Sequence, residues 1–337
     1  MEATRPVPRS AARPTGRPAY RLTRDRVTAL LMLAPSALAI GVFVYGFIAW
    51  TGFVSLTQWS GILANLRFNG LENYVSIFNT GRFQTDIRNT IVFTSLFVVL
   101  TLLLGFVLAV LVDQRVRGET IFRSIYLFPM SLSFIVTGVA MAWIFTPGNW
   151  QNGDPTGINL LFKQMGLGWL QSGWITDSSI WPGGGWFPDW SRTRIGVPLA
   201  MLPVVAAATW QMSGFTMAMY LAGLRAIPDE MREAARVDGA TEWQVVRYII
   251  LPQLTPVTLS AIIVLGHVSL KIFDLIMTMT GGGPGNATDV PGIYMYEITF
   301  KANKVAEGAA VAMVMLVLVA LVIVPYLISN MRNAQEG

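Results

Sequence analysis

The chain has 337 residues, of which 53% are hydrophobic and only 13% charged, and its formal net charge is +5. Soluble domains carry about a quarter charged residues, so this composition excludes an ordinary water-soluble protein and indicates that lipid is the solvent. The absence of cysteine excludes disulfides, thiolate metal sites and cysteine nucleophiles, and a single histidine, His267, excludes multi-histidine metal sites.

The first 26 residues carry seven arginines among Pro, Ala, Gly and Thr. This pattern predicts a disordered basic tail over residues 1–26, ahead of a membrane-embedded domain over residues 27–331. A cleavable signal peptide is disfavoured, because both the basic region and the apolar run after it are longer than such a peptide has.

Six apolar segments are long enough to cross a membrane as helices, since a spanning helix needs about 20 residues. They cover approximately residues 27–50, 89–112, 124–145, 196–224, 255–279 and 308–330. Their length and the scarcity of strict alternation favour helices over barrel strands. The predicted fold class is therefore an all-α membrane protein with six transmembrane helices.

The distribution of Lys and Arg in the loops predicts the orientation. With the N-terminus inside, the inner side holds 15 of these residues and the outer side 8. We therefore expect a multi-pass protein with cytoplasmic N- and C-termini.

The predicted outer segment of residues 147–194 is rich in Trp, Gly and Pro. Two interpretations remain open. The segment is a surface loop that packs its own aromatic side chains, or it contacts an external partner.

The predicted inner segment of residues 225–252 has a helix, glycine turn, helix pattern. Pro228, followed by two acidic residues, begins a short amphipathic helix. Gly239 ends that helix in a left-handed conformation, Thr241 caps a second helix, and Pro252 marks a kink into the next span. Such a projecting helix either docks into a groove of a soluble partner or lies on the lipid surface.

Within that segment, three groups of residues resemble the EAA signature of permease subunits in binding-protein-dependent ABC importers. The groups are Glu233-Ala234-Ala235, Asp238-Gly239-Ala240 and Ile249-Ile250-Leu251-Pro252. The resemblance implies a type I ABC importer permease fold in the cytoplasmic (inner) membrane of a bacterium or archaeon. It also implies a cytoplasmic coupling helix, which sits in a cleft of the ATP-binding subunit. The implied coupling residues are Glu233, Ala234, Ala235, Asp238 and Gly239.

Other segments are similar to the carbohydrate branch of those permeases. They are Phe273-Asp274-Leu275, Thr280-Gly281-Gly282-Gly283-Pro284, Tyr294-Met295-Tyr296 and Phe300. The segments 210–214 and 267–274 look most like glucose or mannose importers. The resemblance implies translocation of a sugar such as one of these monosaccharides. It also implies a second permease subunit in a heterodimer, a dimer of ATP-binding subunits and an extracytoplasmic sugar-binding protein.

The sequence contains no Walker A pattern, and the glycine-rich run at residues 281–285 has no lysine after it. The chain is therefore not expected to bind ATP, and ATP and Mg are assigned to a partner subunit. The sequence also shows no combination of a nucleophile, a general base and a residue that orients that base. The chain is predicted to be a transport component with no cofactor and no catalytic residues of its own.

Ionisable residues inside a span are costly and usually face the bundle interior. Lys271 and Asp274 are three residues apart, so on a continuous helix they lie on one face and can form an ion pair. His267, four residues before Lys271, lies on the same face. They either order the span or line the sugar path, and His267 is either structural or a substrate ligand.

In the fourth span, Gln211 and Phe215 offer an amide and an aromatic face, the two groups that sugars prefer, although packing explains Phe215 equally well. Maltose-type permeases use side chains at positions that match Gln211, Met212, Phe215, Ser269 and Ile272. The predicted substrate path therefore comprises Gln211, Met212, Phe215, His267, Ser269, Lys271, Ile272 and Asp274.

Three alternatives remain. A secondary transporter requires an internal repeat or coupling-ion carboxylates, and Asp274 is the only carboxylate within a predicted span. An intramembrane enzyme lacks an acid–base cluster. The third is an importer of the same class that carries another solute, such as glycerol phosphate. Such a solute is expected to need more cationic groups along the path than Lys271 alone.

Overall fold

The computed structural model describes residues 24–114, 118–181 and 196–336, so residues 1–23 of the predicted tail lie outside the described part. The chain divides into two units, residues 1–50 and 51–337. The first unit holds helix α1 (Arg24–Ile40), the π-helical turn η1 (Gly41–Gly46) and the start of α2 (Phe47–Ser55). Its described apolar side chains are almost all exposed, as a helix surrounded by lipid requires.

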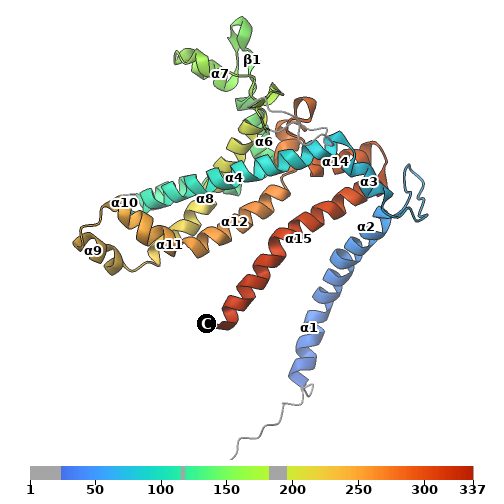
Figure 1. Cartoon of the computed structure of the whole chain (residues 1–337), viewed down its shortest axis with the longest axis horizontal. Helices are drawn as coiled ribbons and strands as arrows, with labels where there is room; N and C mark the ends of the chain where they lie inside the picture. The colour runs from blue at the N-terminus through green and yellow to red at the C-terminus, as the bar shows by residue number, and fades with distance from the viewer. Residues whose placement is uncertain (1–23, 115–117, 182–195, 337) are drawn as a thin grey trace, which may run out of the picture. The chain divides into compact units, whose positions relative to one another are not determined.

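The second unit is built mainly from helices. Its main helices are α3 (Glu72–Phe78), α4 (Gly81–Asp113), α5 (Glu119–Leu127), α6 (Phe134–Ile144), α8 (Met201–Arg225), α12 (Thr255–Leu270), α13 (Asp274–Met279), α14 (Pro291–Tyr296) and α15 (Val305–Glu336). The α8–α12 loop holds α9 (Asp229–Val237), α10 (Glu242–Val245), η6 (Val246–Ile250) and α11 (Leu251–Gln253). Figure 1 shows α4, α8 and α12 running alongside one another, with α9 and α10 at one end of them.

Small residues let α4 and α8 approach closely. A Cβ atom added to Gly105 of α4 would lie 2.7 Å from the Cβ of Thr216 in α8. A second close approach joins α8 to α5, where Gly214 contacts the carbonyl oxygen of Tyr126 so closely that no side chain fits there. Lipid tails are as apolar as the side chains, so no hydrophobic effect drives helices together in a membrane. Close packing of this kind is therefore a main source of helix association there.

Two buried apolar clusters lie along this contact. One surrounds the stacked rings of Phe93 and Phe97, whose centroids are 5.4 Å apart, and includes Met212, Leu265 and Ile272. The other lies at the end that carries α9 and α10. It consists of Leu108, Ala109, Val112, Met217, Tyr220, Leu221, Leu224, Ile227, Val245, Ile250 and Leu254. The base of the α8–α12 loop is therefore part of the core of the bundle.

Among the described residues, three helices are long and apolar enough to cross a membrane, namely Leu31–Ser55, Gly81–Asp113 and Val305–Pro325. The number rises to five if two bent pairs each count as one span. These pairs are Glu119–Ser131 with Phe134–Ile144, bent by 98°, and Glu242–Gln253 with Thr255–Leu270, bent by 65°. The fourth predicted segment overlaps α8, whose 25 residues are mostly buried.

The fifth predicted segment is not one continuous helix. Helix α12 ends at Leu270 and α13 begins at Asp274. The expectation that Lys271 and Asp274 share one helix face is therefore wrong. The backbone leaves the helix at Lys271. The N–H of Phe273 bonds the carbonyl of Lys271, only two residues earlier, instead of a carbonyl four residues earlier as in an α-helix.

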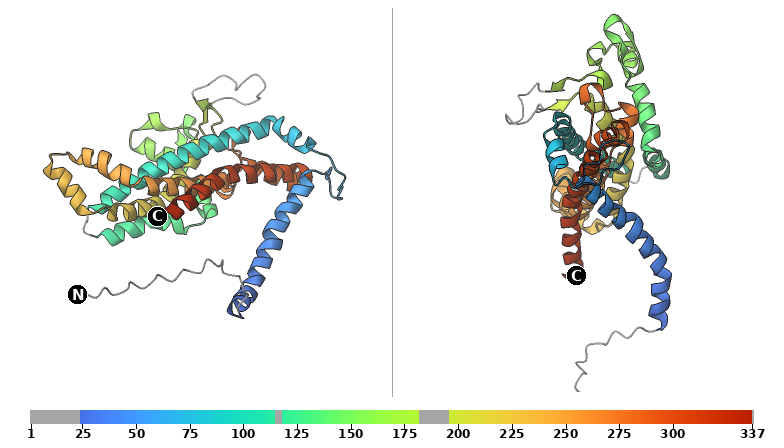
Figure 2. Two further views of the ribbon diagram at one scale, coloured as in Figure 1. Left: turned by 60° about the horizontal axis from the view of Figure 1, so that its bottom comes forward. Right: turned by 90° about the vertical axis from the view of Figure 1, so that its right-hand side faces the viewer.

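A small folded part follows α6, mostly within the predicted outer segment. Its pieces are β1 (Gly148–Asn149), β2 (Asp154–Pro155), α7 (Gly157–Gln164), β3 (Ile180–Trp181) and β4 (Val197–Pro198), with short 3₁₀ turns between them. Strand β1 pairs antiparallel with β2, and β3 with β4. Figure 2 shows this part, in green, projecting from the helices. Residues 182–194 of the predicted loop lie outside the described part.

Asn159 holds this projecting part together. Its side chain is fully buried, donates to the carbonyl of Ser172 at 2.9 Å and accepts from the Trp174 indole at 2.7 Å. The Trp174 ring in turn contacts Phe145, with centroids 5.6 Å apart. The segment therefore packs part of its own aromatic content, as the first interpretation expected, while Trp169 and Trp181 stay exposed.

The contact at Gly214 gives a stability prediction. Gly214→Ala should lower the free energy of unfolding by about 1–3 kcal/mol, because a Cβ atom collides with backbone that cannot move away. Gly266→Ala in α12 is the control, since no atom lies within 4 Å of its added Cβ. Thermal unfolding in detergent measures both variants, and equal melting temperatures for the two would contradict the packing described.

Candidate functional site

Helix α9 is an exposed helix with an acidic beginning. Pro228 precedes it, Asp229 and Glu230 occupy its first turn, and Arg236 its last, so each charge opposes the nearer end of the helix dipole. Of the five predicted coupling residues, Glu233, Ala234, Asp238 and Gly239 are exposed. The fifth, Ala235, is half-buried against the apolar cluster beneath. The helix therefore presents most of its surface outward.

The turn after α9 has the geometry predicted from the sequence. Gly239 has a φ of +84°, where only glycine is free of strain. Its N–H bonds the carbonyl of Arg236 at 3.0 Å, and the N–H of Ala240 bonds that of Ala235 at 2.9 Å. These two bonds make a Schellman motif. Thr241 and Gln244 then form a capping box at the start of α10, which sets the direction of the second helix.

One arginine of α9 connects the loop to the bundle. The guanidinium of Arg232 lies 2.9 Å from Oδ2 of Asp113, the last residue of α4, and donates to the carbonyl of Leu224 in α8 at 2.8 Å. A second arginine, Arg236, instead pairs with Glu242 inside the loop at 2.8 Å. That carboxylate, by its hydrogen bond, raises the pKa of Arg236.

The break between α12 and α13 borders a cavity of about 320 Å³. The cavity is lined by Thr90, Ser269, Leu270, Lys271, Ile272, Phe273, Val290, Gly292, Met295, Tyr296, Phe300 and Met315. Tyr296 stands between Phe273 and Phe300, with ring centroids 5.7 and 5.6 Å away, so one wall carries a row of three aromatic rings, tilted or edge-on to one another. Lys271 is exposed beside them and is the one cation among the described lining residues.

The structure brings together three of the eight predicted path residues, Ser269, Lys271 and Ile272. The hydroxyl of Ser269 is already engaged, since it donates to the carbonyl of Gly266 at 2.7 Å and accepts from Thr94 at 3.0 Å. Asp274 does not line the cavity, and no ion pair joins it to Lys271 in the described part of the chain.

The other predicted path residues lie deeper in the bundle. Gln211 is buried on α8, where its Nε2 donates to the carbonyl of Leu132 at 2.8 Å and its Oε1 has no partner. Met212 belongs to the same apolar cluster as Ile272, and Phe215 packs against that cluster. His267 is half-buried on α12, with Nδ1 enclosed and without a partner.

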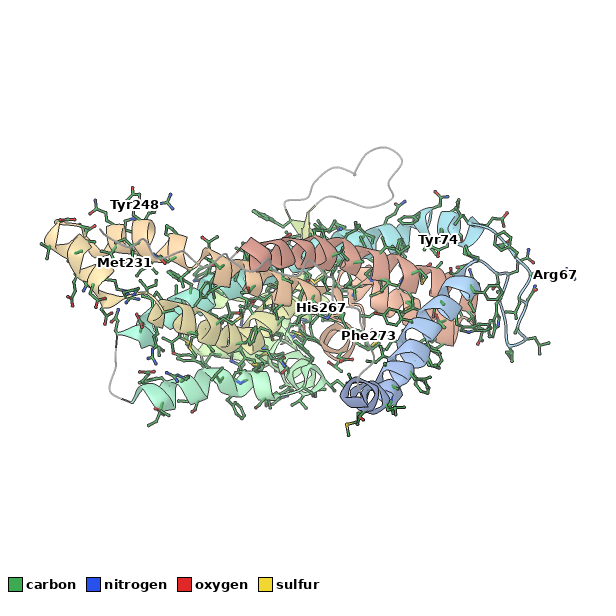
Figure 3. All side chains as sticks on the ribbon, turned by 90° about the horizontal axis from the view of Figure 1, so that it is seen from below. Arg67, Tyr74, Met231, Tyr248, His267 and Phe273 are labelled. Carbon is green, nitrogen blue, oxygen red and sulfur yellow. The ribbon has the colours of Figure 1, made fainter. Side chains whose placement is uncertain are left out.

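Figure 3 shows where the two regions lie along the bundle. Met231 and Tyr248 mark the α9–α10 end, Tyr74 lies toward the opposite end, and His267 and Phe273 lie between them. The loop and the cavity are thus separate sites on one bundle, a terminal one and a central one.

Residues 116–332 match the protein family described as "Binding-protein-dependent transport system inner membrane component". The chain belongs to this family. It is therefore an inner membrane transport component and not an enzyme, as the sequence predicted.

Individual relatives agree with this assignment. The permease is 41% identical to the Probable ABC transporter permease protein of Pyrococcus horikoshii, over 94% of this chain and all of that protein. It is 33% identical to the Xylose/arabinose import permease protein XacH of Haloferax volcanii, over 91% of this chain and 89% of that one.

Solved structures share the fold. A chain from the crystal structure of a bacterial ABC transporter involved in the import of the acidic polysaccharide alginate superposes with a TM-score of 0.69. The superposition covers 92% of this permease and 97% of that chain at 19% identity. The predicted all-α importer permease fold is thereby confirmed.

Sequence reasoning did not assign two features of these sites. The first is the tie from Arg232 to Asp113, which are 119 positions apart. The second is the aromatic wall, although Tyr296 and Phe300 had already been singled out as part of the carbohydrate-branch pattern. The aromatic pair Tyr296 and Phe300, four residues apart, was the available signal in the sequence.

The left-handed turn gives a graded prediction. Non-glycine residues at Gly239 should cost about 1–2 kcal/mol and loosen the Schellman turn. Asn should be tolerated best, Ala less well and Val worst, because Asn adopts this backbone region most readily. Protease sensitivity of the α8–α12 loop in the purified protein measures the effect, and a series in which Val resists cleavage as well as Gly would contradict it.

Proposed function

We propose that this permease is the transmembrane subunit of an ATP-driven importer that translocates a sugar, specifically a monosaccharide such as glucose or mannose. The sugar arrives on an extracytoplasmic binding protein. A second permease subunit completes the pathway as a heterodimer, and two ATP-binding subunits supply the energy. The proposed orientation places both chain termini and the α8–α12 loop in the cytoplasm.

One observation supports the proposed coupling to the ATP-binding subunits: helix α9 is exposed, whereas the base of the α8–α12 loop is buried in the bundle. A helix used only for packing would bury one face, whereas Glu233, Ala234 and Asp238 all point away from the core. The Gly239 turn and the capping box fix the angle between α9 and α10, so the helix is a preformed element suited to a groove on a soluble subunit.

The cavity supports the sugar part. Its volume of about 320 Å³ is near the lower end of ligand sites, which span roughly 300–1,000 Å³, and this favours a monosaccharide over a longer saccharide. The Tyr296 and Phe300 rings offer flat apolar faces for the C–H face of a sugar, and the Lys271 ammonium offers hydrogen bonds to its hydroxyls. The relative named for xylose/arabinose import is consistent with this substrate size.

The mechanism follows as a shift between two states of the permease pair. Closure of the ATP-binding subunits moves the coupling helices and turns the pair from inward-facing to outward-facing. The docked binding protein then releases its sugar into the opened path, and hydrolysis resets the pair. In this scheme α9 receives the motion, and the break at Lys271 contributes part of the path.

An anionic solute, such as glycerol phosphate, is the second candidate. One observation favours it: Lys271 lines the cavity, and no carboxylate pairs with it among the described residues. A single exposed ammonium binds a phosphate only weakly, because clustered arginines are the usual phosphate ligands. We therefore rank the neutral sugar first.

Co-purification tests the importer assignment. A tagged copy should be expressed with the genes that surround its own, with and without Glu233→Ala. The wild type should retain an ATP-binding subunit, and the variant should lose it or hydrolyse ATP without transport, because an exposed carboxylate of the docking helix is gone. Isolation of the intact wild type alone, with transport that needs no ATPase, would instead identify a secondary carrier.

Substrate kinetics test the cavity. In the reconstituted complex, Tyr296→Ala should raise the KM for glucose uptake by about three- to tenfold, which corresponds to the loss of one aromatic contact. Tyr296→Phe keeps the ring and is the control. Uptake of glycerol phosphate in place of glucose, or equal KM values for the two variants, would count against the assignment.

A further inference from the structure

We propose that Arg232 is the positioning residue that transmits motion of the coupling helix into the transmembrane bundle. This inference rests on the proposed function, because it assigns a route to the coupling that the importer mechanism requires. Arg232 joins three helices at one point: it belongs to α9, pairs with the last residue of α4 and bonds a carbonyl in the last turn of α8.

Both bonds are partly sheltered, at the wall of a cavity of about 570 Å³. The side chains of Arg232 and Asp113 are only 16% and 17% exposed. Shelter matters, because an exposed ion pair contributes little and is screened by salt, whereas a desolvated charged hydrogen bond holds its geometry. The carbonyl of Leu224 lies in the last turn of α8 and accepts a bond of 3.3 Å from the N–H of Ile227. The guanidinium is a second donor to it, at 2.8 Å, and so helps to cap that helix.

Other contacts of the loop make different connections. Arg236 pairs with Glu242 within the loop. Arg225 pairs with Glu119 at 2.6 Å and lies 4.0 Å from Asp113, but Arg225 belongs to α8 itself and is 44% exposed. The half-buried Ala235 packs against the apolar cluster beneath α9. Arg232 gives α9 a directional, charged tie to both α4 and α8.

The tie leads toward the cavity. Helix α4 runs from Asp113 back past Gly105, where it is locked against Thr216 of α8, to Thr94. The hydroxyl of Thr94 donates to Ser269 at 3.0 Å, directly before the break between α12 and α13. A rigid displacement of α4 by Arg232 would therefore reach the residue at which the proposed sugar path begins.

Arginine is required for this role. Its planar guanidinium donates in two directions at once, to a carboxylate and to a carbonyl, which one lysine ammonium on a flexible stem does not hold in fixed geometry. The Arg232→Lys variant should therefore take up an amount of glucose per ATP hydrolysed that lies between the values for the wild type and Arg232→Ala. The graded order separates a geometric role from a simple requirement for positive charge.

The test uses the full complex of both permeases, the ATP-binding subunits and the binding protein in proteoliposomes. Radiolabelled glucose taken up per ATP hydrolysed is the readout. Arg232→Ala should keep the ATPase bound and active while glucose per ATP falls by roughly tenfold, within the usual range of coupling between linked sites. Arg236→Ala, an arginine on the same helix with its partner inside the loop, should stay near the wild-type ratio.

A covalent rescue distinguishes transmission from local folding. The chain has no cysteine of its own, so Arg232→Cys with Asp113→Cys introduces its only thiol pair. A short bis-methanethiosulfonate linker should restore the glucose-to-ATP ratio, and reduction should abolish it again.

An unchanged ratio in Arg232→Ala, or a linked pair that stays uncoupled, would overturn the inference. Failure of the wild-type complex to couple glucose uptake to ATP would overturn the proposed function instead.

Discussion

The contact between α4 and α8 is the constraint on which the rest of the structure depends. Gly105 of α4 allows this pair to pack at a distance that no larger residue permits, and in lipid such close contact replaces the hydrophobic driving force of soluble proteins. The ends of both helices anchor the α8–α12 loop through one buried cluster, and their middle sections enclose Phe93, Phe97 and Met212. A rigid pair of this kind moves as a body, which is what an element must do to relay displacement between two sites.

The break between α12 and α13 has a physical cost that its location explains. Inside a membrane, backbone groups outside regular helices lack water to bond, so irregular backbone is tolerated only where protein surrounds it or where it lines a polar cavity. Here Ile272 is buried in the core, so protein surrounds that part of the irregular backbone. Lys271 is exposed at a cavity that is lined mainly by apolar and aromatic side chains. An ammonium facing lipid would be costly, and the cavity gives this one another place to point.

The sequence predicted best what local chemistry determines. Pro228, Gly239 and the Thr241–Gln244 cap act within a few residues, and the helix, turn and helix appear where they were expected. Hydropathy located the apolar segments but could not detect the break at Lys271, because apolar content does not report whether a helix is continuous. The tie between Arg232 and Asp113 joins positions 119 apart and has no local signature. Gln211 and Lys271 were grouped by chemical type, yet only Lys271 lines the cavity, since helix rotation and burial decide which side chains meet.

The central claim is that α9 docks on a separate ATP-binding subunit. Because the chain contains no cysteine, Val237→Cys carries a single benzophenone label on α9 at an exposed position that is not one of the predicted coupling residues. Trp169→Cys, on the projecting part after α6, carries the same label as a control. Illumination of membranes that hold the whole complex should cross-link the label at position 237 to the ATP-binding subunit, with a yield that changes when ATP is added, and should give no such product from position 169. Cross-linking of position 237 to lipid alone would contradict the account and identify α9 as a helix that lies on the membrane surface.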